Sequence, residues 1–559
     1  MTARRAGRRL LAVALLPLAL LGFVAVRRVR ELAADPPGEK DCPPPAPWPA
    51  DTGKPTRLVV APARPLAWAQ QGGAVNDASC LNRTPVHGVV EVRDVEDVRA
   101  ALALARDNGL KVSIAGARHS MGGHAFARGA LVLDMRRLAR MSLDAPAREL
   151  SVQAGATWHD VQTFLHPRFA VKAMQSTDIF TVGGSIAVNA HGMDHRAGSV
   201  GRTVRAMRVM LADGSIRRVS RAENPELFRL VVGGYGLVGV VVDAELDVTD
   251  NVLYRSQRRV IGHREFPALF DGELARDERV GLMYGHLSTS PGSYLDEMLL
   301  YLYREAAGAG DDVPPLDEVG AIRLRRFVFN LAKRGTVPMR IKWLAEKHLE
   351  PWLESCPVRR AQAQGQGEAC LVPRNQPMHD SVRYLKNALP GETDILHEYF
   401  VPHAAFVPFV DAMRAALRQA DANLLNASVR RTPRGPRARL RAGRHVRDRP
   451  LSQPAHRRGG RRAHARPHAP PDRHRRRPRR DVLSPLPAAL HERPAAPRVS
   501  GCRPVLRRQA TLGSGRAVDE HVLRGVRPSL IRGIDTWRSP TAVRRAWPAR
   551  RLALALSAT

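Results

Sequence analysis

The sequence predicts an α+β protein with two folded domains, preceded by an apolar N-terminal segment and a proline-rich linker and followed by an arginine-rich tail. Two observations favour this class. A helical pattern over 94–109 leads into a short alternating strand over 111–115, and an Asp213-Gly214 turn joins two further strands as a hairpin. The chain of 559 residues is 44% hydrophobic, which suits a globular body of two or three domains.

Helical and strand patterns follow one another from residue 94 onward. Asp94 is a predicted N-cap for a helix that Gly109 ends, because aspartate accepts hydrogen bonds from free backbone N–H groups and glycine stops helices. The further expected elements, in chain order, are strands 130–134 and 149–153, a helix 157–166, strands 204–211 and 215–219, a helix 224–232 and a strand 239–248. The order is that of a mixed fold in which helices and strands share one core.

An apolar run lies near the start of the chain. Leu10 to Val26 is uncharged over 17 residues, long enough to span a bilayer without tilt, and arginines flank it on both sides. Arginines also stand where a secretory signal has its small-residue cleavage site, so a signal anchor is favoured over a cleaved signal. The greater positive charge before the run predicts a single-pass inner-membrane protein whose body faces the periplasm or cell exterior.

Residues 35–81 are predicted to form a linker, because the stretch 35–51 is rich in proline and would be stiff and extended. Four cysteines precede the tail. An oxidising compartment would pair Cys42 with Cys80 and Cys356 with Cys370. Four unrelated buried thiols are an equally good interpretation.

The stretch 114–123, IAGARHSMGG, follows the predicted strand 111–115. Its small residues allow backbone N–H groups to converge on an anion such as a phosphate. A second glycine-rich loop, TVGGSIAVNAHG, follows at 181–192. The segment 234–239, GYGLVG, matches a nicotinamide-binding pattern, but a helix precedes it and a strand follows, which is the reverse of the order that such a site requires.

Taken together, GARHS, TVGGSIAVNAHG, ADGS and GGYGLVGVV resemble, in order and spacing, the FAD-binding domain of the vanillyl-alcohol oxidase and p-cresol methylhydroxylase flavoproteins. The resemblance implies a two-lobed FAD-binding domain at 82–251 and a substrate, or cap, domain at 252–429. The His-Ser pair of the first loop is most similar to alditol and sugar-1,4-lactone oxidases. The second loop is also similar to that of decaprenylphosphoryl-ribose oxidases, which lack the first-loop histidine.

Carried across by motif, the resemblance implies a set of cofactor-binding residues. The first loop would hold the FAD pyrophosphate through backbone N–H groups of Ala115, Gly116, Ala117, Arg118, His119 and Ser120. The second wall would consist of Ser176, Thr181, Gly184, Val188, Asn189, Ala190 and His191, with Val240 on the adenine side. His119 matches the histidine that alditol oxidases join covalently to the flavin, whereas His191 is expected only to contact the cofactor.

The second domain has one clear strand, 394–402, in which alternation places His397 on one face and Glu398 on the other. The resemblance places such a strand beside the flavin, where Glu398 or His397 would take a hydroxyl proton. A surface charge and a packed histidine are an equally good interpretation. The basic, apolar stretch 322–349 is expected to be a solvated helical face rather than a lipid contact, and the polar cluster 374–380 has no assigned role.

The tail, 430–559, differs abruptly from the rest of the chain. It has 34 Arg and no Lys against 7 acidic residues, which is +27 of the total charge of +35, and it lacks Phe, Tyr, Met and Asn. A disordered basic extension is one interpretation, although an exported protein is not expected to bind nucleic acid. A frameshift in a GC-rich gene near codon 428 is favoured, and it would leave the cap domain incomplete.

These features predict an FAD-dependent oxidoreductase that oxidises a secondary alcohol of a polyol, sugar lactone or sugar derivative by hydride transfer to flavin N5. Electrons would pass to oxygen or to a membrane quinone. A lipid-linked sugar oxidase of the decaprenylphosphoryl-ribose oxidase type is the alternative among enzymes. A basic surface-binding protein on an inactive flavoprotein-like fold is the alternative outside them. No metal ligand is assigned.

Overall fold

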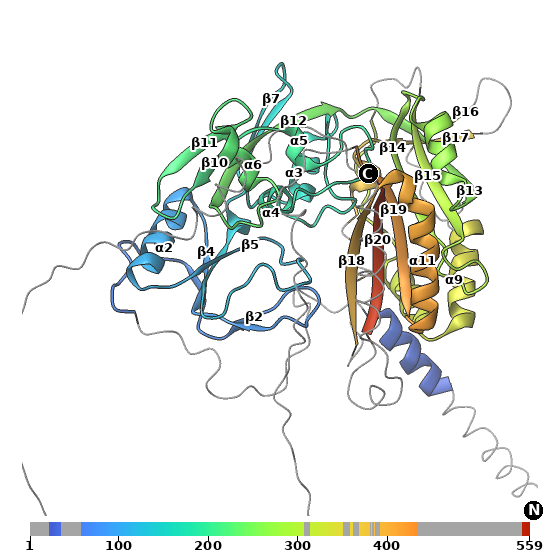
Figure 1. Ribbon diagram of the computed structural model, residues 1–559, viewed down its shortest axis with the longest axis horizontal. Helices are drawn as coiled ribbons and strands as arrows, with labels where there is room; N and C mark the ends of the chain where they lie inside the picture. The colour runs from blue at the N-terminus through green and yellow to red at the C-terminus, as the bar shows by residue number, and fades with distance from the viewer. Residues whose placement is uncertain are drawn as a thin grey trace, which may run out of the picture. The chain divides into compact units, whose positions relative to one another are not determined.

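The computed structural model describes residues 22–34, 58–306, 313–349, 358–361, 368–380, 382, 385, 392–433 and 550–558. Figure 1 shows these residues as ribbons, with strands of three large sheets and one strand of a two-stranded sheet labelled. Two of the large sheets belong to the predicted FAD-binding region, and the third contains the strands of the predicted cap domain. The first sheet also takes one strand, Trp68–Gln71, from the predicted linker 35–81, so this part of the linker prediction is wrong. The mixed α and β architecture expected from the sequence is therefore present.

The first sheet places the first glycine-rich loop. Its strands, in spatial order, are β1 (Trp68–Gln71), β4 (Gly88–Glu91), β6 (Leu131–Asp134) and β5 (Val112–Ala115). β4, β6 and β5 are parallel, and α2 (Val95–Asp107) connects β4 to β5. The Asp94 side chain accepts the N–H of Asp97 and caps α2, as its sequence predicts. A two-stranded sheet, β2 (Ala74–Val75) with β3 (Thr84–Pro85), lies between β1 and β4 in the sequence.

The second sheet carries the second glycine-rich loop on its helices. Its strands are β11 (Ile216–Ser220), β10 (Val204–Met210), β12 (Val240–Asp250), β8 (Glu149–Gln153) and β7 (Met141–Asp144), with β9 (Phe169–Val171) also paired to β12. Its helices are α3 (Trp158–Leu165), α4 (Val182–Val188), α5 (Val200–Thr203) and α6 (Pro225–Val231). The predicted hairpin is present as β10 and β11.

One expectation about this lobe is wrong, because the predicted loop 181–192 contains the helix α4. Glycines disfavour helices in isolation, which is why the sequence indicates a loop. Gly183 donates its N–H to Ala154 O at 2.8 Å, and a Cβ on it would come within 2.7 Å of the Ala154 Cβ. Packing against residue 154 therefore requires glycine here and compensates for its low helix propensity.

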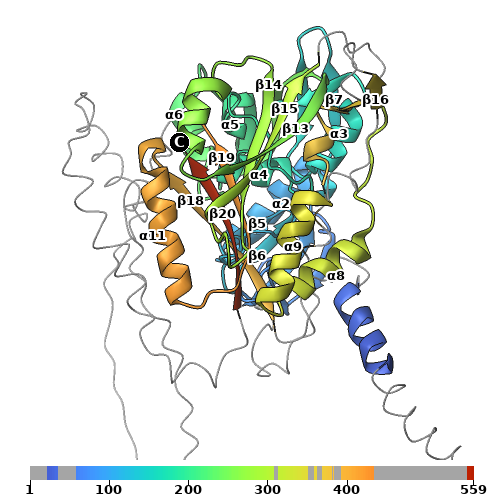
Figure 2. The ribbon, with the colours of Figure 1, turned by 90° about the vertical axis from the view of Figure 1, so that its right-hand side faces the viewer.

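The third sheet forms the cap region. Its strands, in spatial order, are β16 (Val358–Ala361), β17 (Glu368–Pro373), β13 (Leu253–Gly262), β15 (Glu297–Glu305), β14 (Val280–Leu287), β19 (Leu424–Arg431), β20 (Arg550–Ala558) and β18 (Thr393–Val401). Its helices are α7 (Phe266–Leu269), α8 (Ile322–Ala332), α9 (Thr336–His348) and α11 (Phe406–Gln419), and Figure 2 shows α11 and α9 beside its strands. Alternate residues of β15 reach two cores: Leu300 packs with Phe406, whereas Tyr301 packs with the FAD-binding lobe.

The end of the tail differs from the expected disorder. The backbone of β20 pairs in parallel with both β18 and β19, and it is drawn in red in Figure 1. Its sequence alternates leucine with alanine over 552–556, which is a strand pattern that composition alone conceals. Residues 434–549 of the tail lie outside the described residues.

Two predictions about the N-terminal region meet the structure only in part. Residues 22–33 are helical, but 10–21 of the predicted anchor lie outside the described residues. Across the part of the chain that the structure describes, no helix has both the length and the apolar character that a membrane crossing requires. Cys80 is disulfide-bonded, whereas Cys42 and Cys356 lie outside the described residues.

Candidate flavin site

The first loop leaves the carboxyl end of β5 in a tight curl. Arg118 has a left-handed backbone conformation with φ of 59°. Its carbonyl accepts the N–H of Ala78 at 3.0 Å, and its guanidinium lies 3.2 Å from an oxygen of Asp134 at the end of β6. The loop is therefore held through both backbone and side chain, which leaves its short segment of small residues in a fixed shape.

The two predicted loops are in direct contact. The Oγ1 of Thr181 accepts the N–H of Gly184 at 3.3 Å and caps α4. A Cβ placed on Gly116 would lie 2.1 Å from that same oxygen, so only glycine fits opposite Thr181. Residues 65 positions apart in the sequence are thus packed together, as two walls around one cofactor require.

The far end of the second loop is equally constrained. Asn189 ends α4 in a left-handed conformation, and its Oδ1 accepts the N–H of Gly201 at 3.0 Å. A Cβ on Gly192 would come within 1.8 Å of the Met174 carbonyl oxygen. The Ser176 hydroxyl is buried and has no hydrogen-bond partner among the described residues, so it is available to a bound group. Close backbone approach and a buried unpartnered hydroxyl both fit a cofactor at this wall.

The glycine-rich segment before β12 packs on α4. Gly233 and Tyr235 donate their N–H groups to Ile186 O at 3.0 Å and Ala187 O at 2.9 Å. The helix α6 precedes this segment and the strand β12 follows it, which confirms that it is not a nicotinamide-binding turn. Val240 buries its side chain in the core of the first sheet, so only its backbone can meet a ligand.

His119 is half-buried at the far side of the first loop. Its Nδ1 lies 2.6 Å from the Ala117 carbonyl oxygen, and because a carbonyl only accepts, Nδ1 carries a proton in this arrangement. The ring also packs edge-on against Phe180, with centroids 5.5 Å apart. The histidine is held in one orientation by its own loop and by the residue just before Thr181.

The structure brings His191 of the second loop to Glu398 of β18. His191 Nε2 lies 2.6 Å from a Glu398 carboxylate oxygen, and the ring packs edge-on against Phe400. His191 is only 8% exposed, whereas more than a third of the Glu398 side chain is exposed. His397 points to the other face of β18, where its Nδ1 lies 3.3 Å from the Tyr399 hydroxyl. Of the two predicted catalytic residues, only Glu398 contacts the predicted cofactor wall.

Arg430 is a site residue that the sequence did not indicate, because it was assigned to the tail. It lies on β19, which continues past the predicted boundary at 429. Burial lowers the pKa of Arg430, while the charge of Glu398 acts in the opposite direction and places the two side chains in the same electrostatic environment. The alternation of apolar and polar residues along 425–429, LNASV, is the sequence signal that extends the strand to Arg430.

The polar cluster 374–380, to which the sequence assigned no role, begins with a buried arginine that holds two segments together. Arg374 is buried, and its guanidinium lies 2.7 Å from a carboxylate oxygen of Asp194, two residues after the second loop, and 2.9 Å from the Tyr254 hydroxyl. Burial raises the pKa of Tyr254, which therefore stays protonated. Arg374 thus connects the segment after the second loop to the start of the cap region.

Comparison with known proteins agrees with this geometry. Residues 86–220 match the family described as FAD binding domain. The decaprenylphosphoryl-beta-D-ribose oxidase of Mycolicibacterium smegmatis is 35% identical over 156 residues, which is 27% of this chain and 34% of that protein. L-gulonolactone oxidase of Mus musculus is 29% identical over 158 residues, 27% of this chain and 35% of that protein. D-arabinono-1,4-lactone oxidase of Yarrowia lipolytica is 26% identical over 173 residues, 30% and 33% of the two chains.

The chain spans about a third of the length of the curated relatives it matches. The matched residues contain both glycine-rich loops, together with the strands that place them. The contact between Gly116 and Thr181 and the buried hydroxyl of Ser176 fit a bound dinucleotide. The region therefore forms an FAD-binding domain of the vanillyl-alcohol oxidase and p-cresol methylhydroxylase superfamily, and its cofactor is FAD.

Proposed function

We propose that this protein is an FAD-linked oxidoreductase that oxidises a secondary alcohol of a polyol, sugar lactone or sugar derivative. The observation that carries the proposal is the contact of 2.6 Å between His191 on the cofactor wall and Glu398 on β18. It places an exposed carboxylate of the cap region at the edge of the flavin site. The names of two relatives, L-gulonolactone oxidase and D-arabinono-1,4-lactone oxidase, support a sugar-lactone substrate class.

FAD, when bound, would supply the hydride acceptor at N5 of its ring. Glu398 would accept the proton of the substrate hydroxyl while the carbon that bears this hydroxyl loses hydride. The product is a carbonyl compound. His191 holds the carboxylate in place, because its Nε2 lies 2.6 Å from the Glu398 oxygen. Arg430 supplies positive charge in the same environment, which suits a hydroxyl oxygen that is losing its proton. Passage of electrons to oxygen or to a membrane quinone remains part of the proposal.

The first prediction separates Glu398 from its neighbour on the same strand. Glu398→Gln keeps the shape of the side chain but removes the base, so we expect turnover to fall by about 10²–10⁴-fold while flavin content is unchanged. His397→Gln is the matched control, because His397 lies on the opposite face and contacts Tyr399. Steady-state rates on a panel of polyols and sugar lactones measure both variants. Equal rates for Glu398→Gln and the unaltered protein would contradict the assignment.

A second candidate function is the oxidation of a lipid-linked sugar at a membrane. The helices α8 and α9, which the sequence predicts to form a solvated face, expose large apolar side chains. Val337, Ile341 and Leu344 follow one face of α9 at 61%, 58% and 55% exposure. Exposed arginines, Arg323 and Arg340, accompany them. Apolar side chains mixed with basic ones suit the boundary of an anionic bilayer.

The N-terminal helix supports the same location. The Asn330 side chain on α8 donates a hydrogen bond of 2.8 Å to the Leu32 carbonyl, which links α8 to the helix 22–33. The apolar run 10–26 leads into that helix, so an anchor would bring α8 and α9 close to the bilayer. This geometry supports a single-pass inner-membrane anchor with the body on the periplasmic or outer side. The name of the Mycolicibacterium smegmatis relative, decaprenylphosphoryl-beta-D-ribose oxidase, supports a lipid-linked substrate.

Cell fractionation and a substrate comparison test this candidate. The full-length protein should sediment with membranes and require detergent for release, whereas deletion of 10–26 should leave it bound only weakly through α8 and α9. Activity should be greater on a lipid-linked sugar in vesicles than on the free sugar. Equal activity on both, with a protein that stays in the supernatant, would favour a free polyol or sugar lactone instead. A protein with neither flavin nor activity would favour the basic surface-binding alternative.

A further inference from the structure

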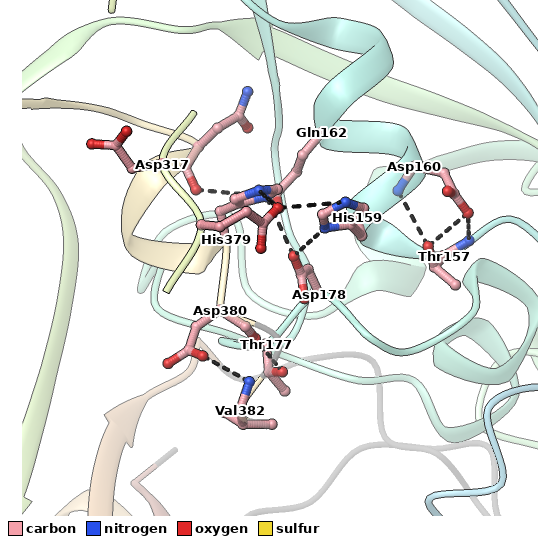
Figure 3. A network of polar contacts seen from close by, with 12 residues as sticks. Thr157, His159, Asp160, Gln162, Thr177, Asp178, Asp317, His379, Asp380 and Val382 are labelled. Atoms are coloured by element: carbon pink, nitrogen blue, oxygen red, sulfur yellow. Dashed lines mark hydrogen bonds and ion pairs between the residues drawn. The ribbon is translucent and has the colours of Figure 1, made fainter. Parts of the chain in front are cut away.

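A cluster of two histidines and one aspartate lies at the junction of the FAD-binding and cap regions. His159 comes from α3, Asp178 from the segment before α4, and His379 from the end of the polar stretch 374–380, and Figure 3 shows their side chains directed toward one another. One ligand atom from each lies within 4.8 Å of the others. Asp178 and His379 are buried, and the imidazole rings are stacked with centroids 4.7 Å apart.

Every ring nitrogen of the pair faces an oxygen. His159 Nδ1 and His379 Nδ1 lie 2.9 Å and 3.3 Å from the same Asp178 oxygen. His159 Nε2 and His379 Nε2 lie 3.7 Å and 3.1 Å from a carboxylate oxygen of Glu318. His379 Nδ1 is also 3.1 Å from the Gln162 amide oxygen, and Gln162 is fixed in that orientation because its amide N–H donates to Asn375 O.

Hydrogen bonding alone satisfies this arrangement only at a high electrostatic cost. A neutral imidazole has one N–H, whereas both ring nitrogens of His379 lie 3.1 Å from an acceptor oxygen, of Gln162 and of Glu318. Hydrogen bonding at both would place a full charge on His379, which is only 3% exposed. A divalent cation removes the conflict, because it replaces the proton at the ring nitrogen that faces Asp178.

A second observation comes from Asp178. Its side chain is 1% exposed, and its Oδ1 has no hydrogen-bond partner among the described residues, although buried carboxylates ordinarily have several. The spacing also suits a metal. Ligand atoms of a tetrahedral zinc site lie ~3.4 Å apart, given metal–ligand bonds of about 2.1 Å, and the atoms around Asp178 are already at comparable separations.

We propose that the Nδ1 atoms of His159 and His379, together with Asp178, bind one Zn²⁺ ion whose remaining position is filled by water. Two imidazoles with one carboxylate form a donor set that zinc accepts. The site is structural: it would fasten the cap segment that carries His379 to α3 and to the residues that lead into Thr181, while Glu318 accepts the N–H that His379 keeps at Nε2. Zinc binding would thus stabilise the wall that packs against Gly116.

The test measures zinc in the purified full-length protein, produced without an affinity tag. We expect one more equivalent of tightly bound zinc in the unaltered protein than in His159→Asn or Asp178→Asn, determined by elemental mass spectrometry after dialysis. The comparison between proteins is needed because the tail contains seven further histidines, which could also bind zinc and which every variant retains. Zinc at 100 times its Kd should raise the folded-to-unfolded ratio about 100-fold in the unaltered protein alone.

Two controls make the result decisive. His159→Asn should fold, because the His159 side chain is 42% exposed. His263→Asn removes another buried histidine, which bonds Asp411 at 3.0 Å, and it should keep the extra zinc. Equal zinc content in the unaltered protein and His159→Asn would overturn the proposal and leave a hydrogen-bonded network only. Flavin content is measured separately in each sample, so failure of the zinc site and failure of the proposed oxidoreductase are distinguishable.

Discussion

His119 is the histidine of the first loop, and its ring is held by contacts that the nearby His124 does not make. Its Nδ1 bonds the Ala117 carbonyl oxygen and its ring packs on Phe180, whereas His124, five residues later, is exposed and lies beside Tyr235. The resemblance to alditol oxidases implies a covalent bond between His119 and the flavin. The two histidines therefore provide a matched pair for a test of that bond.

We expect flavin to remain with the protein after acid precipitation, and His119→Ala to release it into the supernatant. His124→Ala should retain the flavin, because His124 is exposed. Mass spectrometry of the precipitated protein measures the added mass directly. Release of flavin from the unaltered protein would show that the cofactor is held without a covalent bond, as in the lipid-linked sugar oxidases that lack this histidine.

His195 predicts a pH dependence of stability. Burial lowers its pKa to about 4, with further lowering by Arg196 and Arg431 and an opposing effect of Asp194. The unfolded chain binds a proton near pH 6.5 while the folded protein does not, so the contribution is present above that pH and is lost as the pH falls toward 4. From pH 7 to 5 the loss is about 2 kcal/mol. His195→Gln should show a shallower decline in denaturant unfolding over this range; an unchanged decline would contradict this role.

The helix α4 depends on its cap for more than helix stability. Thr181 begins α4 and also contacts Gly116, whereas Thr157 begins α3 with a complete capping box with Asp160. Both threonines are therefore N-caps of short helices in the same lobe. Only one of them adjoins the first loop.

Thr181→Ala and Thr157→Ala should each lower the free energy of unfolding by about 1 kcal/mol, because each removes an N-cap. Thr181→Ala should also weaken FAD binding, since it opens space opposite Gly116. Titration of the flavin-free proteins with FAD measures the difference. If both variants bind FAD equally, the contact between the two loops has no part in holding the cofactor.

The sequence predicts an element where residues close together in the chain determine it, and fails where packing between distant residues does. The helix α3 was predictable because Thr157 and Asp160 satisfy each other's backbone, and the hairpin because Asp213-Gly214 specifies its turn. The helix α4 was not, because its Gly183 is explained by packing on Ala154. β20 was missed because the composition of the surrounding tail outweighed its short alternating pattern.

At the scale of the whole molecule, the sequence predicts the cofactor wall better than the site that faces it. The motifs of the two loops lie close together in sequence, and their resemblance to a known family assigns them as a set. His191 and Glu398 are 207 residues apart, and Arg374 and Asp194 are 180 residues apart. Such pairs depend on how the eight-stranded sheet packs against the FAD-binding lobe, which no local pattern specifies. The partners of His159 and His379 were missed for the same reason.

The central claim is that the two glycine-rich loops close on FAD, and flavin content tests it most directly. The full-length protein should be purified with about one FAD, seen by its flavin absorbance. Gly116→Ala, whose new Cβ would lie 2.1 Å from Thr181 Oγ1, should lose most of it, whereas Gly272→Ala, where a Cβ meets nothing within 4 Å, should keep it. Equal flavin in both variants, or none in the unaltered protein, would contradict the account.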